Sequence, residues 1–189
     1  MQADVGEDAE FQQQGDLELV VMNHETLEVQ TRMLLPDFLL GDAISVTGIA
    51  FDAAYYDVFG DGPAFGLRLS HAGQSRPNPF EQQLLWLFDY DPDGLRPILE
   101  KLIVAQRGGE WDMECAGRFY DISRVLDIAA ERHNGAADIV VLPTEAHSEN
   151  RMEGSECRTF DIPPEMPLQA VTLQYDGERY LVPDGLAGW

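Results

Sequence analysis

The chain has 189 residues, of which 44% are hydrophobic, so it is long and apolar enough to bury a core as one domain. Its 34 acidic and 12 basic side chains give a formal charge of -22 at pH 7. A surface this acidic excludes nucleic acid and anionic membranes as partners, because binding to them depends on lysine and arginine contacts with phosphate. It favours a cationic partner.

The first residues of the chain and its two cysteines bear on the cellular compartment. Residues 1–16 form a polar leader that lacks the basic and apolar regions of a signal peptide. They are typical of the start of a mature exported chain to which Met1 was added, so we expect a periplasmic or secreted protein. In an exported chain, Cys115 and Cys157 are typical of a disulfide; the alternative is two buried reduced thiols. No run of about 18 apolar residues is present, so no membrane insertion is expected.

From residue 17 onward, short β-type segments alternate with turn residues. LELVVMN (17–23) and HETLEVQTRMLL (24–35) predict a hairpin, and AISVTGIAF (43–51) and DIVVL (138–142) predict strands. VTLQYDGERYLV (171–182) predicts a second hairpin that turns at Asp176 and Gly177. TEAHSENRMEGSE (144–156) is polar and acidic, which is typical of a loop.

This pattern predicts a mainly β fold with little helix. We expect antiparallel meanders, packed as a sandwich or as propeller-like blades, in a single domain over residues 17–189. Two passages share the order glycine turn, strand, polar loop, strand, Asp-Gly turn, strand, which indicates two echoing halves of about 43–107 and 108–189.

The acidic segment DYDPDG, between LLWLF and LRPILEKLIV, is the motif with the most specific chemistry. Residues 89–100 match the calcium-loop pattern D-x-[DN]-x-[DN]-G-x5-E. Such a loop supplies carboxylate and carbonyl oxygens to a hard cation. The candidate metal ligands are Asp89, Asp91, Asp93, the carbonyl of Leu95, and Glu100.

Three features favour an acidic hairpin turn at the same residues. Arg96 occupies the eighth loop position, where an apolar residue is usual, and the sequence has no second loop of this kind. The preceding LLWLF is apolar at every position, which suits a buried strand as well as a helix. The alternatives are therefore a hairpin turn stabilised by Gly94, a helix–loop–helix calcium site, and a looser cation site on a β-turn.

Two groups of segments carry a family resemblance. FGLRLSHAGQSRPNPF with LLWLF, and RGGEWDMECAGRF with the later EGSEC and LQYDGERYLVP, are similar to a family of uncharacterised exported proteins from Gram-negative bacteria. The resemblance covers residues from about 50 to the end, and it implies a periplasmic location and pairing of Cys115 with Cys157. HNGAADIVV and DYDPDGL also resemble β-repeats of the FG-GAP and VCBS type, which bind calcium in propeller blades; this chain has that acidic turn once.

The leading functional hypothesis is a non-enzymatic exported binding or interaction domain with an unknown protein or cationic partner. No catalytic residue and no cofactor is assigned, since the sequence lacks nucleophile-elbow, phosphate-loop and dinucleotide motifs. The alternatives are a calcium-binding domain that uses residues 89–100 and a hydrolase that uses an acidic pair.

Overall fold

The fold is that of a computed structural model, which describes residues 14–41, 43–60, 62–91 and 94–188. Every regular element in these ranges is a β-strand, and every pairing is antiparallel. The mainly β prediction is therefore confirmed. The strands are β1 (Leu17–Met22), β2 (Val29–Leu35), β3 (Ile44–Tyr56), β4 (Ala64–Gly73), β5 (Phe80–Asp91), β6 (Gly94–Trp111), β7 (Gly117–His133), β8 (Ala136–Glu153), β9 (Glu156–Ile162) and β10 (Val171–Leu173).

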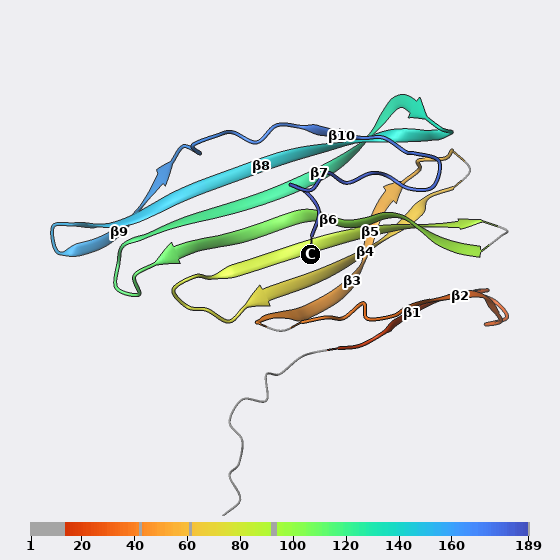
Figure 1. Cartoon of the computed structure of the whole chain (residues 1–189), viewed down its shortest axis with the longest axis horizontal. Helices are drawn as coiled ribbons and strands as arrows, with labels where there is room; N and C mark the ends of the chain where they lie inside the picture. The colour runs from red at the N-terminus through yellow and green to blue at the C-terminus, as the bar shows by residue number, and fades with distance from the viewer. Residues whose placement is uncertain (1–13, 42, 61, 92–93, 189) are drawn as a thin grey trace, which may run out of the picture.

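Eight of the strands form one sheet with the order β10-β8-β7-β6-β5-β4-β3, in which β9 pairs with another part of β8 (Figure 1). From β3 to β8, strands that are adjacent in the sequence are adjacent in space, so the sheet is a meander, as predicted. The separate β1–β2 hairpin lies against this sheet (Figure 1). In the described ranges, no helix is long and apolar enough to cross a membrane.

The middle of the sheet is buried on both faces. Along β5, Leu85 and Leu87 belong to one cluster of buried side chains, whereas Trp86 and Phe88 belong to another. Successive side chains of a strand point to opposite faces, so each face must have its own cover. This explains why LLWLF is apolar at every position.

The β1–β2 hairpin covers one of these faces. Leu19 is buried there, and partly buried side chains of both hairpin strands, including Val21 and Met33, pack around it. The predicted hairpin is confirmed, with Leu19 opposite Met33 in the register. We call the cluster below it the hairpin-side core; its buried members are Leu19, Leu67, Leu69, Leu84, Trp86, Phe88, Leu95 and Ile103.

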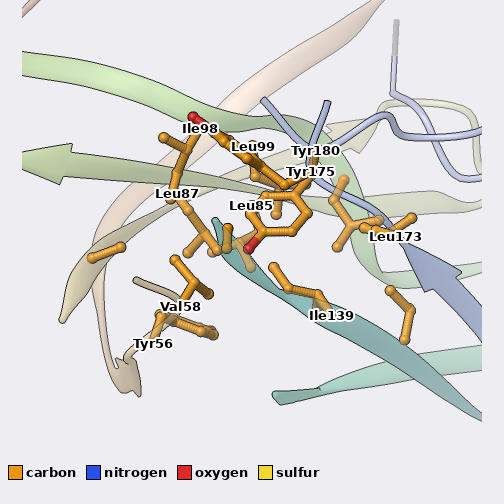
Figure 2. Close-up of a cluster of buried hydrophobic side chains, with 14 of the residues drawn as sticks. Tyr56, Val58, Leu85, Leu87, Ile98, Leu99, Ile139, Leu173, Tyr175 and Tyr180 are labelled. Atoms are coloured by element: carbon orange, nitrogen blue, oxygen red, sulfur yellow. The ribbon is translucent and has the colours of Figure 1, made fainter. Parts of the chain in front are cut away.

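The other face is covered by β7, β8 and the segment 174–188. Only residues 105–111 of β6 pair with β7, and beyond this point β7 pairs with β8 alone. Ile139 of β8 then packs with Leu87 and Tyr180 in the second cluster of buried side chains (Figure 2). We call the segment 174–188 the strap and this cluster the strap-side core; its buried members are Tyr56, Val58, Ala64, Leu85, Leu87, Ile98, Leu99, Leu102, Val104, Ala136, Ile139, Val141, Leu173, Tyr175 and Tyr180. A sandwich results, because β7 and β8 continue past the edge of β6 as a second layer.

The segment 174–188 supplies hydrogen-bond partners to the part of β6 that does not pair with β7. The amide of Tyr180 donates to the carbonyl of Ile98 over 2.8 Å, and the amide of Ile103 donates to the carbonyl of Leu186 over 2.8 Å. The Tyr180 hydroxyl donates to the carbonyl of Ala137 over 2.6 Å and so joins the two layers. Buried backbone groups need such partners, so this irregular segment functions as an edge strand.

Two of the predicted local features differ from the structure. Residues 144–156 do not form a loop, because β8 continues to Glu153 and turns directly into β9. The predicted 171–182 hairpin is confirmed near its turn, where Tyr175 is bridged to Tyr180 and the amide of Leu181 donates to the carbonyl of Gln174. Farther from the turn, residues 171–173 pair with β8, and Tyr180 also bonds to β6. Of the predicted leader, residues 14–16 are described, and Gly15 there exchanges two backbone hydrogen bonds with Leu39. The boundary expected at 107/108 lies inside β6.

Candidate functional site

The acidic segment singled out in the sequence is the tip of the β5–β6 hairpin. Asp89 lies opposite Arg96, and Asp91 lies opposite Gly94. Gly94 has a φ of 131°, a conformation that L side chains rarely adopt, so glycine is required at this turn. The hairpin alternative is confirmed, and the helix–loop–helix geometry is wrong. Asp93 lies outside the described residues.

An arginine side chain occupies the centre of this acidic group. Nη2 of Arg96 donates to Oδ2 of the buried Asp89 over 2.6 Å, and Nη1 donates to the Tyr175 hydroxyl over 2.7 Å. The guanidinium lies 5.3 Å from the ring centroid of Phe59, and its Nε is 3.7 Å from Oδ2 of Asp91. The cation at this turn is therefore supplied by the chain itself.

Of the other two candidate ligands, Glu100 is engaged elsewhere, because it accepts a hydrogen bond from Arg179 over 3.1 Å. Leu95, whose carbonyl was the candidate ligand, has its side chain buried in the hairpin-side core. At about 3.3 Å per residue, Glu100 lies roughly 13 Å along β6 from Arg96. Within the described ranges, no group of three or more histidine, cysteine or acidic side chains is arranged to hold a metal. Calcium binding stays a prediction.

Replacing Arg96 by glutamine is expected to lower the free energy of unfolding by about 2 kcal/mol, because the buried carboxylate of Asp89 then loses its charged partner. Urea unfolding followed by fluorescence measures the change. Arg179→Gln is the control, since its pair with Glu100 is exposed on both sides and should contribute less than about 1 kcal/mol. Equal losses in the two variants would contradict a special role for Arg96.

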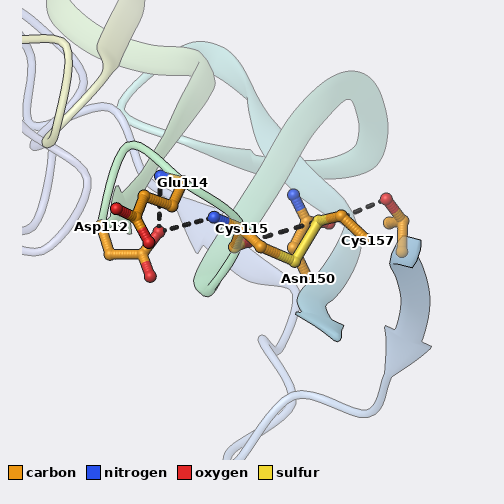
Figure 3. The surroundings of a disulfide bond; sticks show 6 residues. Asp112, Glu114, Cys115, Asn150 and Cys157 are labelled. Carbon is orange, nitrogen blue, oxygen red and sulfur yellow. Dashed lines mark hydrogen bonds between the residues drawn. A yellow bond between two sulfur atoms is a disulfide. The ribbon is translucent and has the colours of Figure 1, made fainter. Parts of the chain in front are cut away.

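Cys115 and Cys157 form a disulfide, as predicted (Figure 3). Their Cα atoms are 5.7 Å apart, and the bond ties the β6–β7 connection to the beginning of β9. On the β6–β7 side, Oδ1 of Asp112 accepts hydrogen bonds from the amides of Glu114 and Cys115, at 2.9 and 2.8 Å (Figure 3). These hydrogen bonds lower the pKa of Asp112, so its carboxylate holds the connection in place when charged.

The best candidate for a binding site is a groove that the sequence interpretation did not identify. It consists of two adjoining cavities of about 450 and 510 Å³ over β4 to β9. Both cavities are lined by Glu81, Arg107 and Asp121, so these three side chains form the middle of the groove.

The middle of the groove is one row of the sheet. Ala72, Glu81, Arg107, Asp121 and Ala146 lie directly opposite one another on β4 to β8, and therefore on the same face. Nε and Nη2 of Arg107 donate to Oδ2 of Asp121 over 3.0 and 2.7 Å, and its Nη1 is 3.9 Å from Oε2 of Glu81. The hydrogen bonds and charge of Asp121, with the charge of Glu81, raise the pKa of Arg107. Two carboxylates thus share one guanidinium, and the small alanines at either end leave open space.

One end of the groove has an aromatic floor. In the next row of the same face, Gly109, Phe119, Ser148 and Asp161 lie opposite one another. A Cβ atom on Gly109 would come within 2.6 Å of the Phe119 ring, and one on Gly117 within 2.9 Å. The ring therefore lies over the backbone of both glycines, and it lines the cavity.

The opposite end of the groove is fixed by a polar network. Arg68 donates to Oδ2 of Asp52 over 2.8 Å and to Oε1 of Gln83 over 2.7 Å, and Gln83 donates to the hydroxyl of Ser70 over 3.2 Å. Burial raises the pKa of Asp52, but the hydrogen bonds that it accepts from the Ala54 amide, Tyr56 and Arg68 and the charge of Arg68 outweigh burial, so the net pKa is lowered. This carboxylate stays charged and holds Arg68 in position.

A further cavity, of about 690 Å³, lies beside the β6–β7 connection. Its lining is less acidic than that of the groove, because the carboxylates of Glu110, Asp112 and Glu149 lie beside two arginines. Arg118 and Arg151 both donate to Glu149, over 3.2 and 3.1 Å. For a chain with an excess of acidic side chains, the groove around Asp121 is the better match to the charge of a cationic partner.

No protein-family model, no curated protein and no solved structure matches this chain. The similarity to exported Gram-negative proteins and to FG-GAP-type repeats stays a prediction.

Proposed function

We propose that the protein is a non-enzymatic, exported binding domain whose groove receives a cationic segment of a partner protein. The observation that carries this proposal is the row across β5, β6 and β7, where Glu81 and Asp121 both approach Arg107. When a cationic group of the ligand displaces that guanidinium, both carboxylates can bind the ligand.

Electrostatics and compartment support the same function. A formal charge of -22 attracts cationic segments from a distance and raises their association rate. The disulfide is consistent with a compartment outside the cytoplasm, and we propose the periplasm or the extracellular space. A calcium-binding role for residues 89–100 and a hydrolase role for an acidic pair stay predictions.

The test is binding of a fluorescein-labelled ten-residue peptide of alternating basic residues and serine, followed by anisotropy at low and high salt. The double variant Glu81→Gln, Asp121→Asn should weaken binding about tenfold, because each exposed ion pair contributes up to about 1 kcal/mol. Both side chains are more than half exposed, so the fold should be retained.

The control is the double variant Glu165→Gln, Glu178→Gln. It removes the same charge from exposed positions outside the groove lining. It should weaken binding less than threefold, through long-range attraction alone. Equal weakening by the two double variants, or no binding of the basic peptide, would overturn the proposal.

A further inference from the structure

Arg107 is held in the groove by exposed contacts. Its side chain is 64% exposed, as is that of Glu81, and that of Asp121 is 53% exposed. Exposed ion pairs of this kind contribute little free energy, so an incoming cation can replace the guanidinium at small cost. The side-on contact of Arg107 Nε and Nη2 with Asp121 Oδ2 also shows which ligand geometry this carboxylate accepts.

The aromatic floor adds a preference between the two basic side chains. Phe119 precedes Asp121 by two residues on the same face of β7, and Asp161 lies in the Phe119 row on β9. A planar guanidinium can lie on an aromatic ring and still donate in its own plane to carboxylates beside the ring, whereas an ammonium group is a compact point charge. The chain uses this arrangement itself, where the guanidinium of Arg151 lies 4.1 Å from the ring centroid of Phe160.

We propose that the groove is an arginine-recognition site. A partner's guanidinium stacks on Phe119, displaces the guanidinium of Arg107, and binds the carboxylates of Asp121 and Glu81 in its place. Arg107 is then an internal competitor for the ligand. This inference rests on the proposed function, and it adds the ligand class and a residue that sets the affinity.

The ligand arm of the test compares three labelled peptides of one sequence that carry arginine, lysine or uncharged citrulline at the basic positions. The arginine peptide should bind about fivefold more tightly than the lysine peptide, and citrulline should abolish binding. Phe119→Leu keeps an apolar side chain over the two glycines and should weaken arginine-peptide binding more than lysine-peptide binding, so that the preference for arginine is lost.

The competitor arm compares Arg107→Gln with Arg32→Gln. Arg32 has a similar exposure of 62% and one carboxylate partner, Glu18, at 3.3 Å, but it lies on β2 away from the groove lining. Both variants make the chain more acidic by one charge, so long-range attraction changes equally. Arg107→Gln should tighten arginine-peptide binding about fivefold, and Arg32→Gln less than twofold.

The outcomes separate the two proposals. If no basic peptide binds, the proposed function fails and the inference fails with it. If basic peptides bind but arginine and lysine are equivalent, or Arg107→Gln is no tighter than Arg32→Gln, the arginine-recognition site is wrong while the proposed function stands.

Discussion

Replacing Leu87 by alanine is expected to lower the free energy of unfolding by about 3 kcal/mol. The alanine replacement of the next residue, Phe88, should lower it by about 4 kcal/mol. Both side chains are fully buried, Leu87 in the strap-side core and Phe88 in the hairpin-side core. Each truncation removes apolar contacts and leaves a cavity that the surrounding layers fill only in part. Urea unfolding, with a constant m-value as the two-state check, measures both losses.

Two large losses at neighbouring positions are the signature of a strand that is covered on both faces. In a sheet with one solvated face, successive side chains alternate between core and water, so one of the two truncations would have little effect. Phe51→Ala on β3 is the control, because that side chain is 72% exposed and its loss should change stability by less than about 0.5 kcal/mol. A small effect of either Leu87→Ala or Phe88→Ala would contradict the two-sided cover.

The same segment shows why the fold class could be predicted from the sequence. A run such as LLWLF, apolar at every position and followed by an acidic, glycine-containing turn, suits a strand buried on both faces as well as a helix. The other segments, which show β-type alternation between turn residues, favoured the strand. The β1–β2 hairpin could also be predicted, because its inner face is apolar at alternate positions. These signals come from burial, which is recorded directly in the order of apolar and polar residues.

Where burial is slight, the sequence carried no such signal. The sequence predicts a loop for the second half of β8, since TEAHSENRME is mostly polar and acidic. In the structure this half pairs with β7 and β9, and many of its side chains are exposed. Such strands form through their ladder hydrogen bonds and through the layers that they extend, so their side chains need no apolar alternation.

The groove was missed for a related reason. Glu81, Arg107 and Asp121 come from three strands and meet only through the register of those strands, which a single sequence does not specify. One local signal was present, because the pair Gly108 and Gly109 within a strand indicates a close approach by another group. In the structure these glycines make room for the rings of Tyr120 and Phe119. Register also explains the acidic motif, where the spacing matched a calcium loop but strand pairing placed Arg96 opposite Asp89.

Reduction of the Cys115–Cys157 disulfide is expected to loosen β9 and the adjoining half of β8 before any other part of the sheet. The bond closes a sequence separation of 42 residues, and in the chain-entropy model such a loop contributes about 4 kcal/mol. β9 pairs with β8 alone and is exposed at five of its seven positions, so it has little other support. The double variant Cys115→Ala, Cys157→Ala should lose up to this amount in stability.

Hydrogen exchange locates the effect. Amides of residues 147–162 should exchange much faster in the variant or in reduced wild type, whereas those of residues 84–88 and 98–103 should change only through global unfolding. The variant should not respond to reductant, which controls for effects of the reagent. Uniform acceleration across the sheet would show instead that the disulfide stabilises the whole fold.

The disulfide is also expected to affect ligand binding. Thr159 and Asp161 of β9 line the groove, and Asp161 lies in the same row as Phe119. If β9 separates from β8, the aromatic end of the groove loses this wall, while Glu81 and Asp121 on β5 and β7 stay in place. Reduction should therefore weaken the arginine peptide more than the lysine peptide, since the ion pairs remain and the stacking position is disturbed. An equal effect on both peptides would show that the disulfide does not contribute to arginine recognition and has a structural role alone.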